Sequence, residues 1–201
     1  RRGSGGEDDG PSRALMRYAD KVAESEMAKI GLDAFGVRRP DRFARGGDHL
    51  PSLDLGFPAI RFTVGVENYH HQHQDVRTEN GIEYGDTVDK MDFDYLAKVT
   101  MLNVFTANAL SVAPPAPASA TLGGAVTSNT TVKWDAAPGA QRYRIYQRLA
   151  DAQDWVFVRD VQGTETVLEG LIVDDHFVGV SSVSASGGES IITFAGLPPR
   201  R

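Results

Sequence analysis

A stretch rich in proline and alanine, SVAPPAPASA at 111–120, divides the chain into two parts of different character. Proline favours the extended polyproline conformation, so we expect this stretch to be a stiff linker. Helical patterns dominate 11–110, whereas short β-rich runs dominate 121–198. Residues 1–10 are Gly-rich and charged and are expected to be flexible. The sequence therefore predicts two domains, the second of which folds on its own.

Runs of β-branched and aromatic residues recur beyond the linker at intervals of roughly ten residues, with turn signals between them. The runs are 130–134, 141–148, 154–160, 164–168, 175–183 and 190–194. This spacing predicts a small all-β, antiparallel sandwich.

Particular positions within these runs carry a resemblance. Trp134 ends the second expected strand, and Tyr143 and Ile145 alternate on the third. Leu171 stands six residues before Phe177. In these features the second part resembles a fibronectin type III domain, although that family commonly has Tyr at the position of Phe177. The resemblance implies a fold and indicates no particular function.

Two amphipathic helices are predicted in the first part. One covers 11–30, with Pro11 in its first turn and Gly31 ending it. The other covers 92–110 and begins at Asp92, a good N-cap residue. The apolar positions expected to face a core are Leu15, Ala19, Val22, Ala23, Met27 and Ile30 in the first helix, and Phe93, Leu96, Ala97, Met101, Val104 and Phe105 in the second.

The stretch 46–75 between these helices holds four of the five histidines. Its apolar run 57–66 is bounded by Gly and Pro and rich in β-branched residues, which predicts a buried strand. Polar loops at the ends of buried strands are where α/β enzymes place their chemistry. The preceding basic stretch, 38–47, is either a solvated loop or a contact for an acidic group.

A second resemblance rests on this stretch. GGDHLPSLDLGFPAIRF (46–62) resembles the Asp-His segment of the M28 family of zinc aminopeptidases, and YHHQHQD (69–75) resembles its last metal-binding segment. The helix at 92–110 also fits, so the resemblance covers about 11–110 and implies the C-terminal part of that domain. Residues that depart from the pattern are Gly47, Ser52, Gln72 and Val76.

The resemblance implies an α/β fold with a zinc-peptidase sheet flanked by helices. Enzymes of this family use two zinc ions and a Glu general base to activate a water that cleaves N-terminal residues from peptides. Most of the family's ligands lie upstream of the matched region, and the chain contains no Glu-Glu pair. We therefore expect at most one zinc ligand here and no activity from this chain alone.

The remaining ligand is assigned by register. In the family the last metal-binding His stands four residues before an Asp, and Asp75 therefore selects His71. His70 and His73 are its competitors. Alternate residues of an extended segment can project to one side, so His71 and His73 could act together.

Other polar residues are expected to support this site. Asp75, Asp48 and His49 would orient the loop and its imidazole by hydrogen bonds. Asp48-His49 is alternatively a buried turn whose Asp accepts backbone N–H groups. His176, in a sandwich strand, is expected to be an ordinary surface residue.

Composition narrows the possible partners. The net charge of −6 argues against binding a nucleic-acid backbone, and the absence of Cys excludes thiolate metal sites. The longest apolar runs fall short of the ~20 residues that a membrane span requires. The chain begins with Arg and is expected to be part of a longer product. The peptidase resemblance suggests a peptide substrate and a secreted or periplasmic location. The alternative to a peptidase function is that the chain is a non-catalytic binding module.

Overall fold

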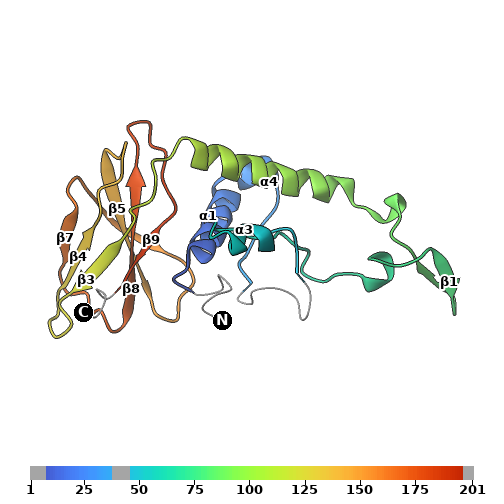
Figure 1. Ribbon diagram of the computed structural model, residues 1–201, viewed down its shortest axis with the longest axis horizontal. Helices are drawn as coiled ribbons and strands as arrows, with labels where there is room; N and C mark the ends of the chain where they lie inside the picture. The colour runs from blue at the N-terminus through green and yellow to red at the C-terminus, as the bar shows by residue number, and fades with distance from the viewer. Residues whose placement is uncertain (1–7, 38–45, 197–201) are drawn as a thin grey trace.

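The computed structural model describes residues 8–37 and 46–196 and is elongated (Figure 1). A β-sandwich forms one end. Helix α4 (Phe93–Ser111) runs from it along the molecule towards a small hairpin at the other end, and α1 (Pro11–Ser25) and α3 (Leu50–Asp54) lie between. The predicted features at 1–7, 38–45 and 197–201 lie outside the described residues.

The predicted helix at 11–30 is present with a break near its end. Pro11 occupies the first turn of α1, which ends at Ser25, and a second short helix, α2 (Met27–Ile30), follows directly. The backbone of Glu26 leaves helical geometry between them. Gly31 then ends α2 in the left-handed conformation, at φ +60°, which glycine adopts without the steric penalty that a Cβ brings.

These helices enclose a small core. The buried side chains that join α1, α2 and α4 are Val22, Ala23, Ile30 and Leu102. Partly buried apolar residues, including Phe62 and Phe105, pack against them. So few buried side chains provide little hydrophobic stabilisation for so long a segment.

Helix α4 begins as predicted, because Asp92 Oδ1 accepts a hydrogen bond from the Tyr95 backbone N–H at 2.9 Å. The predicted apolar face is wrong in most of its members. Phe93 is 57% exposed and Val104 is 62% exposed, whereas Leu102 is fully buried. Of the side chains that the pattern assigned to a core, only Phe105 packs against one, and the others lie at the surface of the described structure.

The predicted buried strand at 57–66 is also wrong. This segment is extended but pairs with no strand among the described residues, and Phe57 and Val66 are 63% and 92% exposed. A strand needs a neighbour for its backbone groups, and the described segments provide none. The expected zinc-peptidase sheet between the helices is therefore absent from the described part of the chain.

The segment is nevertheless tied to α1. The Ala59 backbone N–H donates to Ser12 Oγ at 3.2 Å, and Phe62 packs on the helical core. Further along, two short strands, β1 (Arg77–Glu79) and β2 (Ile82–Tyr84), pair antiparallel. The predicted Asn-Gly turn joins them, with both residues at positive φ. A 3₁₀ helix, η2 (Val88–Lys90), leads on to α4.

The predicted antiparallel sandwich is confirmed. One sheet has the strand order β3-β4-β7 and the other β6-β5-β8-β9. The strands are β3 (Ala120–Gly123), β4 (Thr130–Trp134), β5 (Arg142–Leu149), β6 (Val156–Val161), β7 (Glu165–Leu168), β8 (His176–Val183) and β9 (Thr193–Ala195). Every predicted run overlaps one of the strands β4 to β9.

The sandwich has its own core between the two sheets. Trp134, Tyr143, Ile145 and Leu171, the residues on which the resemblance of this part rests, are all buried there. The Trp134 and Tyr143 rings meet edge to face at 5.5 Å, and the Tyr143 hydroxyl accepts the Ala137 backbone N–H at 2.8 Å. This core contains no residue of the helical part.

The corner before β8 is held by His176, and not by Phe177, the residue at the position where Tyr is common. Phe177 turns to the outer face of its sheet, where it packs on Phe194. The half-buried neighbour His176 instead donates from Nδ1 to the Ile172 backbone carbonyl at 3.1 Å. An imidazole thus makes a hydrogen bond of the kind that a corner Tyr makes in immunoglobulin-type sandwiches.

The Pro/Ala-rich stretch is anchored along the sandwich. The Ser182 hydroxyl donates to the Pro115 carbonyl at 2.5 Å, and the Thr193 hydroxyl donates to the Pro117 carbonyl at 2.6 Å. Gly188 comes so close to the start of this stretch that an added Cβ would lie 2.3 Å from the Val112 carbonyl oxygen. None of the helices in the described ranges combines the length and hydropathy that a membrane crossing would require.

We expect Gly188→Ala to destabilise the protein, because the methyl group would push the backbone at Val112 away from the sandwich. Overpacking of this kind costs about 1–3 kcal/mol, and each kcal/mol lowers Tm by about 2–4 °C in a chain of this size. Gly163→Ala is the matched control, since its added Cβ meets no atom within 4 Å. Equal Tm values for the two variants would contradict the close packing.

Candidate functional site

His71, the predicted zinc ligand, lies in the 3₁₀ helix η1 (Tyr69–His71) and is half-buried. Asn68 caps this helix, because its side-chain Oδ1 accepts the His70 backbone N–H at 3.0 Å. The amide nitrogen of the same side chain lies 3.2 Å from His71 Nδ1. One residue thus fixes both the helix and the imidazole.

This contact selects a tautomer of His71. An amide nitrogen can only donate, so Nδ1 of His71 accepts and the neutral ring carries its proton on Nε2. Zinc binding through Nε2 needs the opposite tautomer, in which Nδ1–H donates to an acceptor. The Asn68 amide would have to turn its oxygen to the ring and release the His70 N–H. The carboxylate or carbonyl that metal-bound imidazoles usually contact is replaced here by this amide.

The neighbouring histidines are more exposed. The His70 ring packs at 4.9 Å from the Tyr84 ring of β2, and its backbone carbonyl accepts the Gly85 N–H at 3.0 Å. His73 has a positive φ of 54°, and Asp75, which set the register, is exposed. The His-rich loop is therefore docked on the β1–β2 hairpin.

Asp48 and His49 lie at the start of α3, where Asp48 is exposed and His49 is half-buried. Helix α3 lies in the middle of the molecule, whereas the hairpin that supports the His71 loop lies at its far end (Figure 1). Within residues 8–37 and 46–196, no three His, Asp or Glu side chains gather as a metal group. The residues present supply one imidazole, which is too few for a zinc ion that needs about three protein ligands.

A denser polar cluster, which the sequence patterns did not predict, lies between α1 and the four-stranded sheet. The outer face of this sheet would meet water in an isolated sandwich. Here Tyr146, Arg148 and Ser181 on that face are buried. Glu189, in the turn between β8 and β9, is the centre of the cluster.

The Glu189 carboxylate accepts four hydrogen bonds. The Tyr146 and Ser181 hydroxyls donate to Oε1 at 2.5 and 2.7 Å. The Arg144 guanidinium and the Lys21 ammonium donate to Oε2 at 2.7 and 3.1 Å. Lys21 is the member from α1, so the carboxylate joins the helix to the sheet.

Two cations, Lys21 and Arg144, surround this single carboxylate. Burial alone would raise the pKa of Glu189, but the Tyr146 hydroxyl, Lys21 and Ser181 hold that pKa below its usual value. Burial, followed by the hydrogen bond to Glu189, raises the pKa of Tyr146. The Tyr18 hydroxyl of α1 adds a neutral bond to the Glu189 backbone carbonyl at 3.0 Å.

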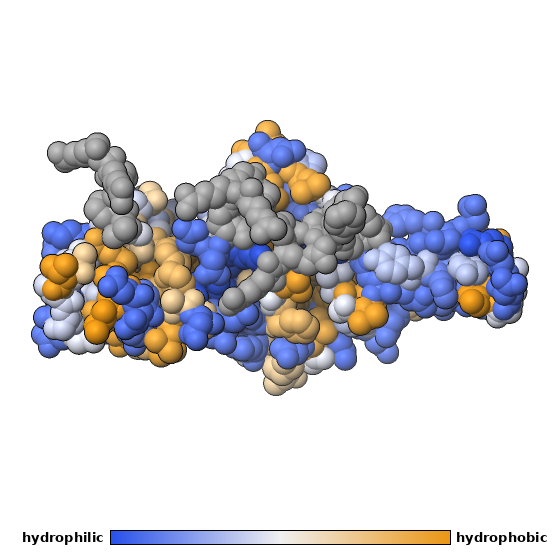
Figure 2. Space-filling view, turned by 90° about the horizontal axis from the view of Figure 1, so that it is seen from below, coloured by the Kyte–Doolittle hydropathy of each residue, from blue (hydrophilic) through white to orange (hydrophobic). Residues whose placement is uncertain are grey.

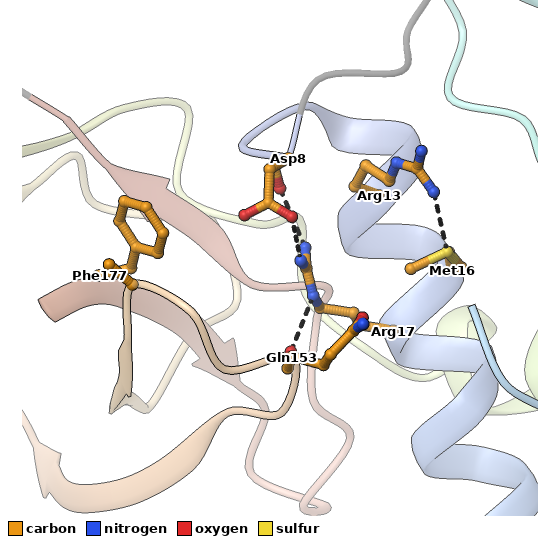
Figure 3. Close-up of a pocket in the computed structure, with 7 residues that line it drawn as sticks. Asp8, Arg13, Met16, Arg17, Gln153 and Phe177 are labelled. Carbon is orange, nitrogen blue, oxygen red and sulfur yellow. Dashed lines mark hydrogen bonds and ion pairs between the residues drawn. The ribbon is translucent and has the colours of Figure 1, made fainter. Parts of the chain in front are cut away.

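A second junction lies on the same face, beside a cavity of about 310 Å³ (Figure 3). Arg17 reaches from α1 to the Asp8 carboxylate at 2.5 Å and to the Gln153 backbone carbonyl at 3.1 Å. The other Asp8 oxygen binds the guanidinium of Arg148 on β5. The two arginines hold the pKa of Asp8 below its usual value, although burial raises it.

Arg148 is only 2% exposed, because aromatic rings surround it. Its guanidinium carbon lies 4.5 Å from the Phe177 ring centre, 4.9 Å from that of Trp155 and 6.0 Å from that of Phe194. It also donates to the Ala152 backbone carbonyl at 2.6 Å. A guanidinium is suited to such a place, since it is weakly hydrated and stacks on rings.

A larger cavity of about 530 Å³ opens between α1 and the sheet. Its lining residues come from both parts of the chain: Ala14, Arg17, Tyr18, Asp20, Lys21, Glu24, Arg144, Tyr146, Asp154, Trp155, Phe157, Glu189, Ser190 and Ile192. Burial, and then the negative charges of Glu24, Asp154 and Asp33, raise the pKa of Asp20 to about 6. The cavity thus combines aromatic walls with a group of mutually repelling acids.

One sequence signal could have indicated this interface. In β5 the residues on the outer side of the sheet are Arg144, Tyr146 and Arg148, which alternate with the core residues Tyr143 and Ile145. Large aromatic and Arg side chains are enriched at protein contacts, so such a strand face favours a covered surface. The partner of that face could not be read from the pattern.

We expect Asp20→Asn to stabilise the protein at pH 7.5. The pKa of Asp20 in the folded state, about 6, lies above its ordinary value of 3.8, so ionised Asp20 opposes folding above about pH 6 and this penalty fades towards pH 4. For a partly exposed group we expect on the order of 1 kcal/mol, or about 2–4 °C in Tm.

Thermal melts at pH 7.5 and about pH 4 test this dependence, with the exposed Asp151→Asn as control. The Tm gain should appear only for Asp20→Asn and only at the higher pH. A loss of stability at pH 7.5 would mean that the Asp20 carboxylate has a favourable partner.

Several curated proteins are similar to this chain in sequence. No family model matches the chain. A protein named probable zinc metalloprotease from Leptosphaeria maculans is 40% identical over 189 residues, covering 92% of this chain and 43% of that protein. Proteins of the same name from Pyrenophora teres f. teres and Pyricularia oryzae are 37% and 35% identical, covering 92% and 94% of this chain and 39% of each relative. The chain therefore spans less than half the length of these curated relatives.

Two solved structures with some similarity to part of this chain are named for the fibronectin type III domain. An Fn3-like protein from Clostridium thermocellum is 21% identical with a TM-score of 0.35, covering 44% of this chain and 95% of that one. A fibronectin type III domain of human collagen XX is 24% identical with a TM-score of 0.33, covering 42% of this chain and 84% of that one.

Proposed function

We propose that this chain is the C-terminal part of a zinc-dependent metallopeptidase. The observation that carries the proposal is the similarity to several proteins named probable zinc metalloproteases, at 35–40% identity over more than nine-tenths of the chain. Those relatives are more than twice as long as the region matched. The additional polypeptide would supply the metal ligands that the described residues lack.

The exposed apolar surface of the first part supports this proposal. Phe93 and Val104 on α4, together with Phe57 and Val66 of the extended segment, would be unfavourable in water. A longer polypeptide would cover these side chains and would supply a strand to pair with 57–66. Figure 2 shows apolar residues at the surface in the middle of the molecule as well as on the sandwich, whereas the hairpin end is mainly hydrophilic.

The finer proposal is an aminopeptidase of the M28 type acting on peptides. Zinc would supply a water that is acidic enough to serve as a nucleophile near neutral pH. Among the residues of this chain, His71 would hold one ion once the Asn68 amide has turned its oxygen towards the ring, while Asp75 and His73 would shape the loop. Asp48 and His49 remain proposed supports of the loop that holds His71 and of its imidazole. A secreted or periplasmic location belongs to the same proposal, and a signal sequence in the full-length product would support it.

The alternative function is a non-catalytic binding module. It is favoured by the sandwich and by the cavity at its interface with α1, both of which are complete within the described residues. The two functions differ in whether the full-length product turns over a substrate in a zinc-dependent manner.

Substituting His71 in the full-length product tests the peptidase proposal. We expect His71→Ala to lose bound zinc and to lower kcat/KM for aminoacyl chromogenic substrates by more than the ~10–100-fold typical of residues that only support a ligand. The matched control is His70→Ala, which removes a ring that packs on Tyr84. It should keep its zinc and change activity less than about threefold, because it leaves the ligand in place.

Zinc content, measured by elemental analysis, and turnover should fall together in His71→Ala alone. The 201-residue chain by itself should give background turnover with added Zn²⁺. Full activity and full zinc content in His71→Ala would remove this residue from the metal site, and chelator-sensitive turnover by the 201-residue chain would show that its ligands are misassigned.

A further inference from the structure

The cavity of about 530 Å³ between α1 and the four-stranded sheet has the size of a ligand pocket. Much of its wall is aromatic or apolar, from Tyr18 on the helix and Trp155, Phe157 and Ile192 on the sandwich. Its two sides come from segments far apart in the sequence. The helix and the sandwich must therefore be docked for the cavity to exist.

The basic side chains around this cavity are already engaged. Lys21 and Arg144 both donate to the Glu189 carboxylate, and Arg17 binds Asp8. None of the three is left to neutralise a further acid. The positive charges of the lining therefore neutralise the carboxylates of Glu189 and Asp8, which belong to the interface itself.

Apart from Glu189, the acidic side chains of the lining lack such partners. Asp20 and Glu24 of α1 and Asp154 of the β5–β6 turn form no hydrogen bond or ion pair with any described residue. Burial, and then the uncompensated charges of Glu24 and Asp154, raise the pKa of Asp20, and exposed Asp33 adds to the effect. Like charges kept together against their own repulsion are common where a protein binds a ligand of opposite charge.

Aromatic walls together with unpaired carboxylates favour one chemical class of ligand. A lysine or arginine side chain has an apolar stem and a cationic head, so the stem can lie on aromatic rings while the head meets carboxylates. A neutral apolar group would leave the acids unpaired, and an anionic group would add to their repulsion. Charge complementarity therefore favours an organic cation of this shape.

We propose that this cavity binds a basic side chain, Lys or Arg, of a peptide. The choice of a peptide as its carrier rests on the proposed peptidase function, whereas the cationic chemistry rests on the cavity alone. The sandwich contributes Trp155 and Asp154, and α1 contributes Asp20 and Glu24. In the full-length protein the cavity is a secondary substrate site that favours peptides with a basic residue.

Peptide titration of the 201-residue chain tests the proposal without any need for catalysis. The probes are Ac-Ala-Lys-Ala-NH₂, its norleucine analogue, which keeps the stem and loses the charge, and its glutamate analogue. Trp155 fluorescence reports binding, because the other tryptophan, Trp134, is buried in the sandwich core. Calorimetry gives the affinity independently. We expect saturable binding of the Lys peptide, at least about tenfold tighter than the norleucine peptide, and none of the glutamate peptide.

Charge-removing variants locate the site. The double variant Asp20→Asn/Asp154→Asn should bind the Lys peptide about tenfold more weakly, since two surface-type ion pairs are lost. Asp151→Asn, in the same turn as Asp154 but outside the cavity lining, should bind like the wild type. Circular dichroism melts confirm that each variant is folded.

Equal affinity for the Lys and norleucine peptides, no binding of the Lys peptide, or equal weakening by Asp151→Asn would overturn the proposal. None of these results would affect the zinc content or turnover of the full-length product. Conversely, a full-length product without zinc-dependent turnover would overturn the peptidase function while leaving the measured cation binding intact.

Discussion

The fold depends on one largely buried carboxylate, that of Glu189, whose side chain is 10% exposed. Four donors from three separate segments converge on it, and Lys21 is the only one from α1. A buried carboxylate is strongly unfavourable unless its oxygens are satisfied. The arrangement therefore holds only while helix and sheet stay docked. Breaking it by removing one partner leaves charge without compensation inside the interface, which is far more costly than losing an exposed ion pair.

Docking against α1 turns the outer face of the four-stranded sheet from a solvent-facing surface into part of an interior. An isolated sandwich would present Arg148, Tyr146 and Ser181 to water, and here they form part of an interior. The anchored Pro/Ala-rich stretch works in the same direction, because its carbonyls accept hydrogen bonds from β8 and β9. The sandwich is thus a fixed wall beside α1, and the cavity with its unpaired acids is a product of that contact. The proposed binding role of the sandwich rests on its position beside α1 as much as on its own surface.

Local patterns predicted local structure well, and tertiary partners were predicted poorly. The Asp92 cap, the Gly31 stop, the Asn-Gly turn and the buried Trp134 each follow from signals within a few residues. The strand expected at 57–66 failed because burial depends on neighbours, and no described segment pairs with it. For the same reason the apolar face of α4 was assigned to a core that the described residues do not form. Glu189 carried no motif at all, because its role arises only when α1 and the β8–β9 turn meet. The metal-site residues stay predictions, since their proposed partners lie beyond this chain.

Differential scanning calorimetry of the wild-type chain and of Glu189→Gln tests the docking most directly. The glutamine keeps the shape but removes the charge that holds Lys21 and Arg144. We expect the wild type to unfold in one transition, because α1 and the sandwich stabilise each other. The variant should show two transitions, a weakened helical part melting first and the sandwich, with its separate core, melting later. Two transitions in the wild type, or a single unchanged transition in Glu189→Gln, would contradict the central role of this carboxylate.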